Sequence, residues 1–268
     1  MAHPNRYEQL IEHIFFTYYK DGDTSVEFAR DAIEMAARKM KIKLPKNLGD
    51  LIYSFRYRTE LPKKIAACAP AGKQWIIRAS GRSRYTFFAA QLTRIAPNPQ
   101  LAQTKVPDAT PGIIAKYALS DEQALLAKLR YNRLIDVFTG VTCYSLQSHL
   151  RTTAPNIGQV ETDEIYIGID KRGAHFVFPV QAKGGRDKIN AVQIEQDFAM
   201  CAAKFPNAIC RPLAAQFMAD DLIALFELEQ PQVAHLSIVI SAERHYRLVA
   251  PDELSADEIK VYNQRPEG

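Results

Sequence analysis

The sequence is poor in cysteine and histidine, and it has no long apolar run. Its four cysteines are scattered without C-x-x-C pairs and its six histidines are dispersed, so neither a disulfide framework nor a zinc constellation is expected. No apolar stretch approaches the roughly 20 residues that span a bilayer. The first residues alternate polar and apolar types and lack the core of a signal peptide. These absences predict a cytoplasmic protein that does not bind membranes.

Positive charge is concentrated in one part of the chain. The 268 residues carry a net charge of only +4, but residues 51–110 hold ten Lys and Arg against two acids, and residues 111–268 are mildly acidic. A basic block of this kind indicates a polyanionic partner, unless it is simply a solvated face. The length allows one large domain or two of medium size.

The basic block belongs to a segment with the order helix, helix, helix, hairpin. Apolar residues at helical spacing predict helices at 5–19, 24–40 and 48–58, the second capped by Thr24 or Ser25. The runs QWIIRAS and RYTFFAAQL then read as two strands joined by a short turn around Gly81. This is the order of a winged helix-turn-helix, although small modules of this kind also serve as plain interaction domains.

In a winged helix-turn-helix, the third helix enters the major groove of DNA and the arginines of the hairpin meet phosphates or the minor groove. The side chains expected to contact DNA are Asn47, Ser54, Arg56 and Arg58 from the helix, and Arg78, Arg82 and Arg84 from the hairpin. Because phosphate contacts release counterions, binding is expected to weaken steeply with salt.

A proline-rich segment separates this module from the rest of the chain. Residues 96–112 hold four prolines and little periodicity, which predicts a linker. We therefore expect a winged-helix domain with its linker at 1–110 and a second domain at 111–268.

The second domain is expected to be a mixed sheet flanked by helices, which makes the whole chain α/β. Its patterns predict helices at 121–140, 145–153 and 189–204, strands at 159–170 and 175–183, and further strands after residue 204. Ser145 and His149 fall one turn apart on the second of these helices, but no acid completes a hydrolase triad.

Charged residues interrupt two strands that otherwise read as buried. Alternation puts Glu161, Asp163 and Ile165 on one face of the first strand, and Thr162 and Glu164 on the other.

In the second strand Gln181 and Lys183 share a face, so a hairpin would place Asp163 beside both. Pro179 cannot donate to a ladder and predicts a bulge or a pairing gap. Carboxylate and amide oxygens hold Mg²⁺, and a nearby lysine offsets charge on a phosphate, which suits metal-assisted phosphodiester hydrolysis.

The motif VETD before an apolar strand, with PVQAK ending the next strand, resembles the PD-(D/E)XK nuclease superfamily, the restriction-endonuclease-like fold. The resemblance is closest to members with E-x-D followed by Q-x-K. It covers the order of elements over about 120–268 but only a handful of identical residues.

The resemblance implies that Asp163, Gln181 and Lys183 are catalytic. It also implies that Asp163, Gln181 and the backbone carbonyl of Ala182 hold Mg²⁺, for which Mn²⁺ can substitute. Gln181 is neutral where the family usually has an acid, so weaker metal binding is expected.

Helical residues are also expected near this site. Gln193 or Gln196 would approach it from the helix at 189–204, and Glu122 and Asp136 are candidates for an additional acid from the helix at 121–140.

The sequence thus predicts a two-domain, Mg²⁺-dependent DNA endonuclease of restriction type that cuts double-stranded DNA as a homodimer. Two alternatives stay open. One is a DNA-binding regulator whose nuclease-like domain is inactive, as the neutral Gln181 allows. The other is a repair or junction-resolving nuclease, which would prefer branched DNA.

Overall fold

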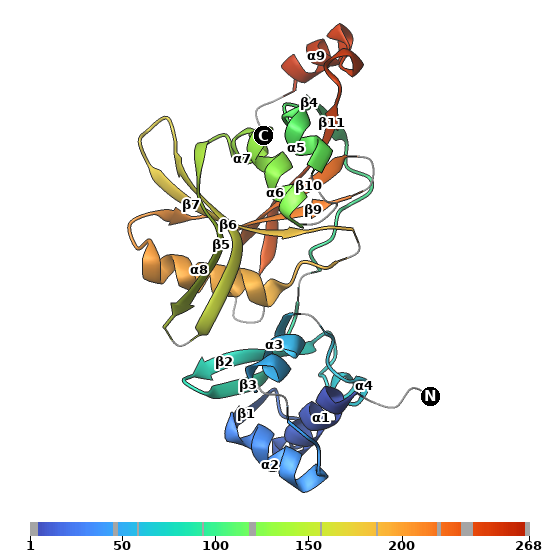
Figure 1. Cartoon of the computed structure of the whole chain (residues 1–268), viewed down its shortest axis with the longest axis vertical. Helices are drawn as coiled ribbons and strands as arrows, with labels where there is room; N and C mark the ends of the chain where they lie inside the picture. Colours follow the sequence, from blue (N-terminus) through green and yellow to red (C-terminus); the bar gives the residue numbers. More distant parts are fainter. Residues whose placement is uncertain are drawn as a thin grey trace.

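A computed structural model describes residues 5–44, 48–57, 59–92, 94–117, 122–155, 157–185, 187–218, 221–231 and 238–265. The chain forms two lobes, each with its own sheet (Figure 1). We call residues 5–90 the N-terminal lobe and residues 103–265 the C-terminal lobe. None of the described helices combines the length and hydropathy that a membrane span requires.

The N-terminal lobe packs helices on a three-stranded antiparallel sheet of order β1-β3-β2. Its elements are α1 (Arg6–Tyr18), β1 (Ser25–Ala29), α2 (Asp31–Met40), α3 (Gly49–Tyr57), α4 (Lys63–Ala67), β2 (Gln74–Gly81) and β3 (Arg84–Ala90). Its core centres on Phe15, whose ring meets those of Trp75 and Phe87 edge to face at 5.1 and 5.0 Å. Burial of such rings is the main stabilising contribution in a module this small.

Three of the four predictions for this lobe hold, and one is wrong in part. The first helix, the third helix and the hairpin are confirmed. The helix expected at 24–40 begins only at Asp31, because Ser25–Ala29 is strand β1. Val26 and Phe28 point into the core while their neighbours are exposed, a period of two that identifies a strand. Neither Thr24 nor Ser25 is therefore a helix cap.

The C-terminal lobe is built on a mixed sheet of order β4-β11-β10-β9-β7-β6-β5, with β8 beside β7. β4 runs parallel to β11, and β7 runs parallel to β8 and β9. The strands are β4 (Gln103–Pro107), β5 (Thr142–Ala154), β6 (Gly158–Ile169), β7 (His175–Lys183), β8 (Ile209–Cys210), β9 (Leu213–Phe217), β10 (Leu222–Glu229) and β11 (Val239–Val249). The helices are α5 (Gly112–Tyr117), α6 (Glu122–Tyr131), α7 (Leu134–Thr139), α8 (Ala191–Lys204) and α9 (Ala256–Asn263).

Helices cover both faces of this sheet. Leu213 and Ala215 of β9 pack in one core cluster with Leu125 of α6, whereas Ala214 packs in another with Ile194 of α8. Neighbouring residues of a strand point to opposite faces, so α6 and α8 lie on opposite sides. The expected mixed sheet flanked by helices is therefore confirmed.

Three predictions for the C-terminal lobe need correction. Within the expected linker, Gln103–Pro107 is strand β4, paired with β11. The expected helix at 121–140 is two helices, broken where Arg133 adopts a left-handed φ of 49°. The expected helix at 145–153 is part of strand β5. Leu146 and Leu150 imitate a helical repeat there, but Leu146 is 56% exposed and the backbone pairs with β6.

The two lobes meet where α3 and β2 face α8 (Figure 1). An apolar cluster of Ile76, Ala90 and Val192 joins them. Arg78 of β2 forms an ion pair with Glu195 of α8, and the Tyr57 hydroxyl of α3 bonds to Gln196. Helix α8 thus contacts the N-terminal lobe on one side and the C-terminal sheet on the other.

Candidate functional site

Strands β6 and β7 pair along most of their length and then separate. Their register runs from Ile169–His175 to Glu164–Val180 and ends there. On its other edge β7 pairs with β8 at Phe176–Val177 and with β9 from Val180 onwards. Pro179 falls between these two ladders, which confirms the expected pairing gap. The residues after the fork carry the predicted site.

The Asp163 carboxylate lies in the fork between the strands. Its Oδ2 accepts a hydrogen bond of 2.8 Å from the backbone N–H of Ala182 and lies 4.0 Å from Lys183 Nζ. The ammonium group of Lys183 also donates to Glu122 Oε1 at 2.7 Å. Asp163, Ala182 and Lys183 are therefore brought together, and Glu122 of α6 is the helical acid that joins them.

Burial shapes the electrostatics of Asp163, which is only 8% exposed. Loss of hydration raises the pKa of its carboxyl group, while Lys183 and the Ala182 N–H act in the opposite direction. A lysine that is 16% exposed and bound to two acids is held at a fixed position rather than free in solvent.

Gln181 turns to the other side of the sheet. Its Nε2 donates to Asp197 Oδ2 of α8 at 2.9 Å and to the backbone oxygen of Glu161 at 3.2 Å. Thr162 donates to the second oxygen of Asp197 at 2.5 Å. The sequence predicted that Gln181 and Lys183 point the same way. Their terminal groups instead bind different elements, Asp197 of α8 and Glu122 of α6.

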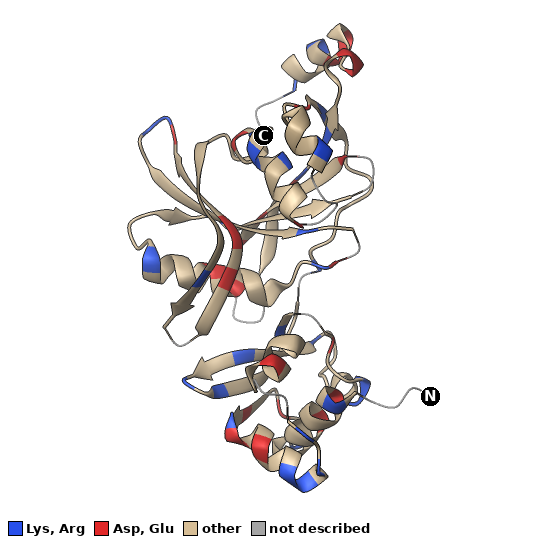
Figure 2. Ribbon diagram, in the orientation of Figure 1, with Lys and Arg blue, Asp and Glu red and all other residues tan. Residues whose placement is uncertain are grey.

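Asp197 is fully buried behind the fork. Desolvation raises the pKa of its carboxyl group to about 7, and the negative charge of Asp163 contributes in the same direction. The charge of Asp163 on one side of the sheet therefore affects the pKa of Asp197 on the other side. Figure 2 shows acidic segments of β6 and α8 next to each other in the C-terminal lobe.

The strict alternation expected for β6 is interrupted at Asp163. Thr162 bonds to α8, but Glu164 accepts from Arg130 of α6 at 2.8 Å on the opposite face. Ser145 Oγ also donates to Glu164. Because one residue separates Thr162 from Glu164, they would share a face in a regular strand. The irregularity turns Asp163 towards Lys183 and Glu122.

The oxygen donors of this cluster suit a hard cation such as Mg²⁺. The Oε1 atom of Gln181 is buried and has no hydrogen-bond partner among the described residues. Unpaired buried oxygens are costly unless something binds them. Among the described residues no three His, Cys, Asp or Glu side chains are placed to hold a metal ion by themselves, but Mg²⁺ often uses only one or two carboxylates together with water and phosphate. Asp163 therefore fits the expected ion, whereas the unpaired oxygen of Gln181 belongs to an amide that bonds to Asp197 on the other side of the sheet.

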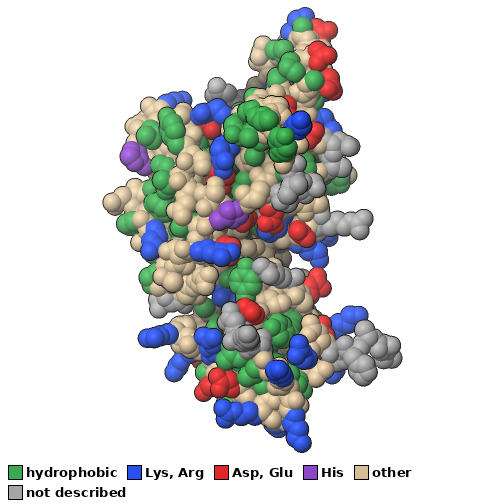
Figure 3. All heavy atoms as spheres, in the orientation of Figure 1, with side chains coloured by type: hydrophobic (Ala, Val, Ile, Leu, Met, Phe, Trp, Pro, Cys, Tyr) green, Lys and Arg blue, Asp and Glu red, His purple; other side chains and the backbone are tan. Residues whose placement is uncertain are grey.

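The residues expected to contact DNA fall into different environments. Asn47 and Arg58 lie outside the described residues. Ser54 shares a 3.0 Å hydrogen bond with Thr59. Arg82 and Arg84, at the turn between β2 and β3, are exposed. Figure 3 shows Lys and Arg side chains spread over the N-terminal lobe.

Arg56 and Arg78 belong to the contact between the lobes. The backbone oxygen of Arg56 accepts a 2.7 Å hydrogen bond from Asn190, and its guanidinium lies over the Tyr57 ring. Arg78 is held by Glu195. The side chain of Arg78 thus faces α8, whereas Arg56 contacts the start of α8 only through its backbone oxygen.

Other candidates are placed away from the fork. Gln196 bonds to Tyr57 of the N-terminal lobe. Asp136 accepts from the backbone N–H of Cys143 at 2.9 Å and pairs with Arg133. Sequence reasoning missed Asp197. The available signal was its position in the predicted helix at 189–204, the helix from which Gln193 or Gln196 was expected to approach the site.

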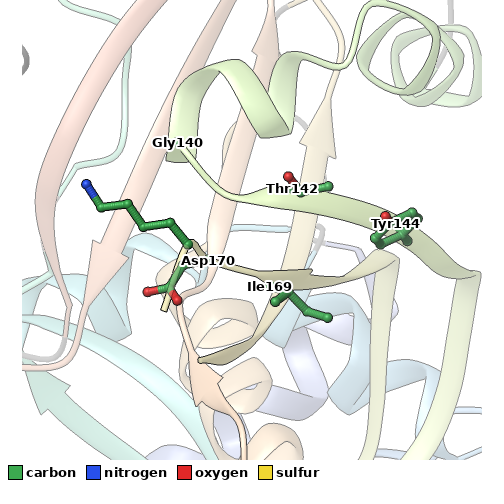
Figure 4. A pocket seen from close by; sticks show the side chains of 6 residues that line it. Gly140, Thr142, Tyr144, Ile169 and Asp170 are labelled. Carbon is green, nitrogen blue, oxygen red and sulfur yellow. The ribbon is translucent and has the colours of Figure 1, made fainter. Parts of the chain in front are cut away.

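An open pocket of about 440 Å³ lies at the other end of β6 (Figure 4). It is lined by Gly140, Thr142, Tyr144, Ile169, Asp170 and Lys171. Ile169 is six residues from Asp163, roughly 20 Å along an extended strand. The Asp170 carboxylate is occupied by Arg172 and by the turn that follows. This pocket is therefore separate from the fork.

No model of a known protein family matches the sequence, and no curated protein matches it either.

Proposed function

We propose that the chain is a Mg²⁺-dependent endonuclease of restriction type that hydrolyses phosphodiester bonds of double-stranded DNA. The observation that carries this proposal is the meeting of Asp163, Lys183 and Glu122 at the fork. Carboxylate oxygens next to one lysine are the groups that metal-assisted phosphoryl chemistry needs. On this proposal the C-terminal lobe has a restriction-endonuclease-like fold.

Each residue then has a definite part in the reaction. Asp163 and the Ala182 carbonyl would hold the ion, which when bound polarises the phosphate and lowers the pKa of a water ligand. Lys183 offsets the negative charge that grows on the phosphate oxygens. Glu122 positions the ammonium group of Lys183. Asp197 fixes the amide of Gln181.

The N-terminal lobe is proposed to be a winged-helix module that grips the DNA. Its element order, helix, strand, three helices and hairpin, supports this, as does the excess of positive charge in residues 51–110. Arg82 and Arg84 at the hairpin are exposed and available for phosphate contacts. Cleavage of both strands needs two active sites, so we propose that a homodimer acts on the DNA.

The test is cleavage of mixed plasmid and phage DNAs by wild type with Mg²⁺, by wild type with EDTA, and by Lys183→Ala. The matched control is Lys260→Ala, which lies in a second acid-x-Lys pattern, Glu258-Ile259-Lys260, on the exposed face of α9. Discrete fragments from wild type and Lys260→Ala, lost with EDTA and with Lys183→Ala, are expected.

Salt-sensitive DNA binding without cleavage, in Mg²⁺ or Mn²⁺, would overturn the nuclease and point to a DNA-binding regulator. Preferential cutting of branched DNA would replace the restriction-type assignment by a junction-resolving one. Absence of both binding and cleavage would reject the proposal for both lobes.

A further inference from the structure

His149 of β5 lies directly opposite Asp163 of β6. The register pairs Ser148 with Glu164 and Leu150 with Thr162, which places residue 149 across from residue 163. His149 has a φ of 49°, and it is the one residue with a left-handed φ inside a strand of the described chain other than glycine. Such a conformation is sparsely populated for residues with a side chain and is often retained at functional sites.

The imidazole of His149 stands at the open side of the fork. The residue is exposed, and its Nε2 is hydrogen-bonded to the side-chain amide of Gln123 on α6. The neighbouring Glu122 is the acid that binds Lys183. The side chain of Gln123 from α6 thus contacts the ring, and Asp163 of β6 lies across from His149 in the strand register.

The bond from Gln123 decides which ring nitrogen is free to donate. Nε2 of His149 faces the side-chain amide of Gln123, which leaves Nδ1 as the other ring nitrogen; Nδ1 carries the ring proton whenever Nε2 acts as the acceptor. Nδ1 bonds to none of the described residues. A hydrogen-bond donor is thus held in place at the edge of the cluster and has no partner within it.

The charge of the cluster makes such a donor useful. Glu122 and Asp163 are two carboxylates against the single ammonium of Lys183. A phosphodiester, which is an anion, would be repelled by the excess negative charge unless donors or a cation received it. An exposed N–H beside Asp163 is placed to receive one of its oxygens.

We propose that His149 is a substrate-binding residue, with its Nδ1–H donating to a non-bridging oxygen of the phosphodiester and Gln123 holding the ring in place. This inference rests on the proposed nuclease function and adds a residue that the sequence motif does not contain. This role requires only that the ring has an N–H group to donate. A neutral imidazole already has one, so the role does not need a charged ring.

The test compares wild type, His149→Gly and His149→Asn in steady-state cleavage of one duplex DNA with Mg²⁺. Glycine tolerates the left-handed φ, so His149→Gly removes the ring without straining the backbone. A lost hydrogen bond to a charged group is expected to lower kcat/KM about 10- to 100-fold. His149→Asn, which keeps a shorter donor, is expected to fall between. The midpoint of urea unfolding should be unchanged or higher for His149→Gly.

His175→Ala is the matched control, because His175 is an exposed histidine at the far end of the same sheet, and its cleavage should equal that of wild type. Gln123→Ala should reproduce part of the loss by releasing the ring. Equal kcat/KM for wild type and a folded His149→Gly would overturn the role of His149 while leaving the nuclease intact. Wild type that cuts no DNA with Mg²⁺ would instead reject the proposed function itself.

Discussion

At the scale of single residues, Gln181 is held as a neutral donor. It has no exposed surface, and its amide nitrogen supplies hydrogen bonds to Asp197 and to the backbone oxygen of Glu161. A carboxylate in its place could donate to neither. The pKa of Asp197 is already raised to about 7 by burial, so a second buried carboxylate beside it would be poorly tolerated. Glutamine at this position therefore follows from the presence of Asp197.

Replacing Gln181 by Glu should lower the free energy of unfolding in EDTA. The variant loses the two hydrogen bonds that the Gln181 amide donates, and it places a second carboxyl group beside Asp197 in a buried site. Together these changes are expected to cost at least about 2 kcal/mol. Urea unfolding at pH 7 measures this. Gln74→Glu, the same change at an exposed residue, should stay within about 0.5 kcal/mol of wild type. Unchanged stability of Gln181→Glu would show that Gln181 is not held against Asp197.

At the scale of elements, β6 fits between β5 and β7 only because Gly168 has no side chain. A Cβ atom at this position would lie 2.7 Å from Val141 Cγ1 and 2.8 Å from Phe178 Cε2, and 3.2 Å from Cys143 Sγ. Real Cβ contacts are essentially never this short, and core side chains around the site are closely packed. A side chain at position 168 would therefore displace Val141 and Phe178, which pack on β6.

Gly168→Ala is expected to destabilise the protein by about 1–3 kcal/mol, because the side chains of Val141 and Phe178 must move to admit the methyl group. Urea unfolding measures the loss. Gly112→Ala is the control, since an added Cβ there meets nothing within 4 Å. If both variants unfold at the same urea concentration, the packing of β5 on β6 is looser than described.

The elements that sequence patterns predicted well are those with strong local signals. The apolar runs of β6 and β7, with the acid and lysine near their ends, located the fork, and Pro179 predicted its pairing gap. Strand β5 was missed because Leu146 and Leu150 have helical spacing, although it is pairing with β6 that fixes their conformation.

Asp197 and the break at Asp163 were missed for a different reason. Both depend on which residues of distant elements meet, and α8 approaches β6 only in the folded chain.

At the scale of the whole molecule, the contact between the lobes divides the basic residues of the N-terminal lobe into two groups. Arg78 is neutralised by Glu195, and the backbone of Arg56 is bound by Asn190. Both contacts lie beside the apolar cluster around Val192. Arg82 and Arg84 are exposed at the hairpin. If DNA binds without separating the lobes, Arg82 and Arg84 are free to contact phosphates, whereas the guanidinium of Arg78 stays paired with Glu195.

The salt dependence of DNA binding distinguishes the two groups. Each phosphate contact adds about 0.9 to the slope of log K against log salt concentration. Arg82→Ala is therefore expected to reduce the slope by about 0.9, while Arg78→Ala, measured on the same duplex in EDTA, should leave it unchanged. A slope reduced equally by both changes would mean that Arg78 leaves Glu195 on binding. The lobes would then separate when DNA arrives, and α8, which carries both Glu195 and Asp197, would be the element through which binding reaches the fork.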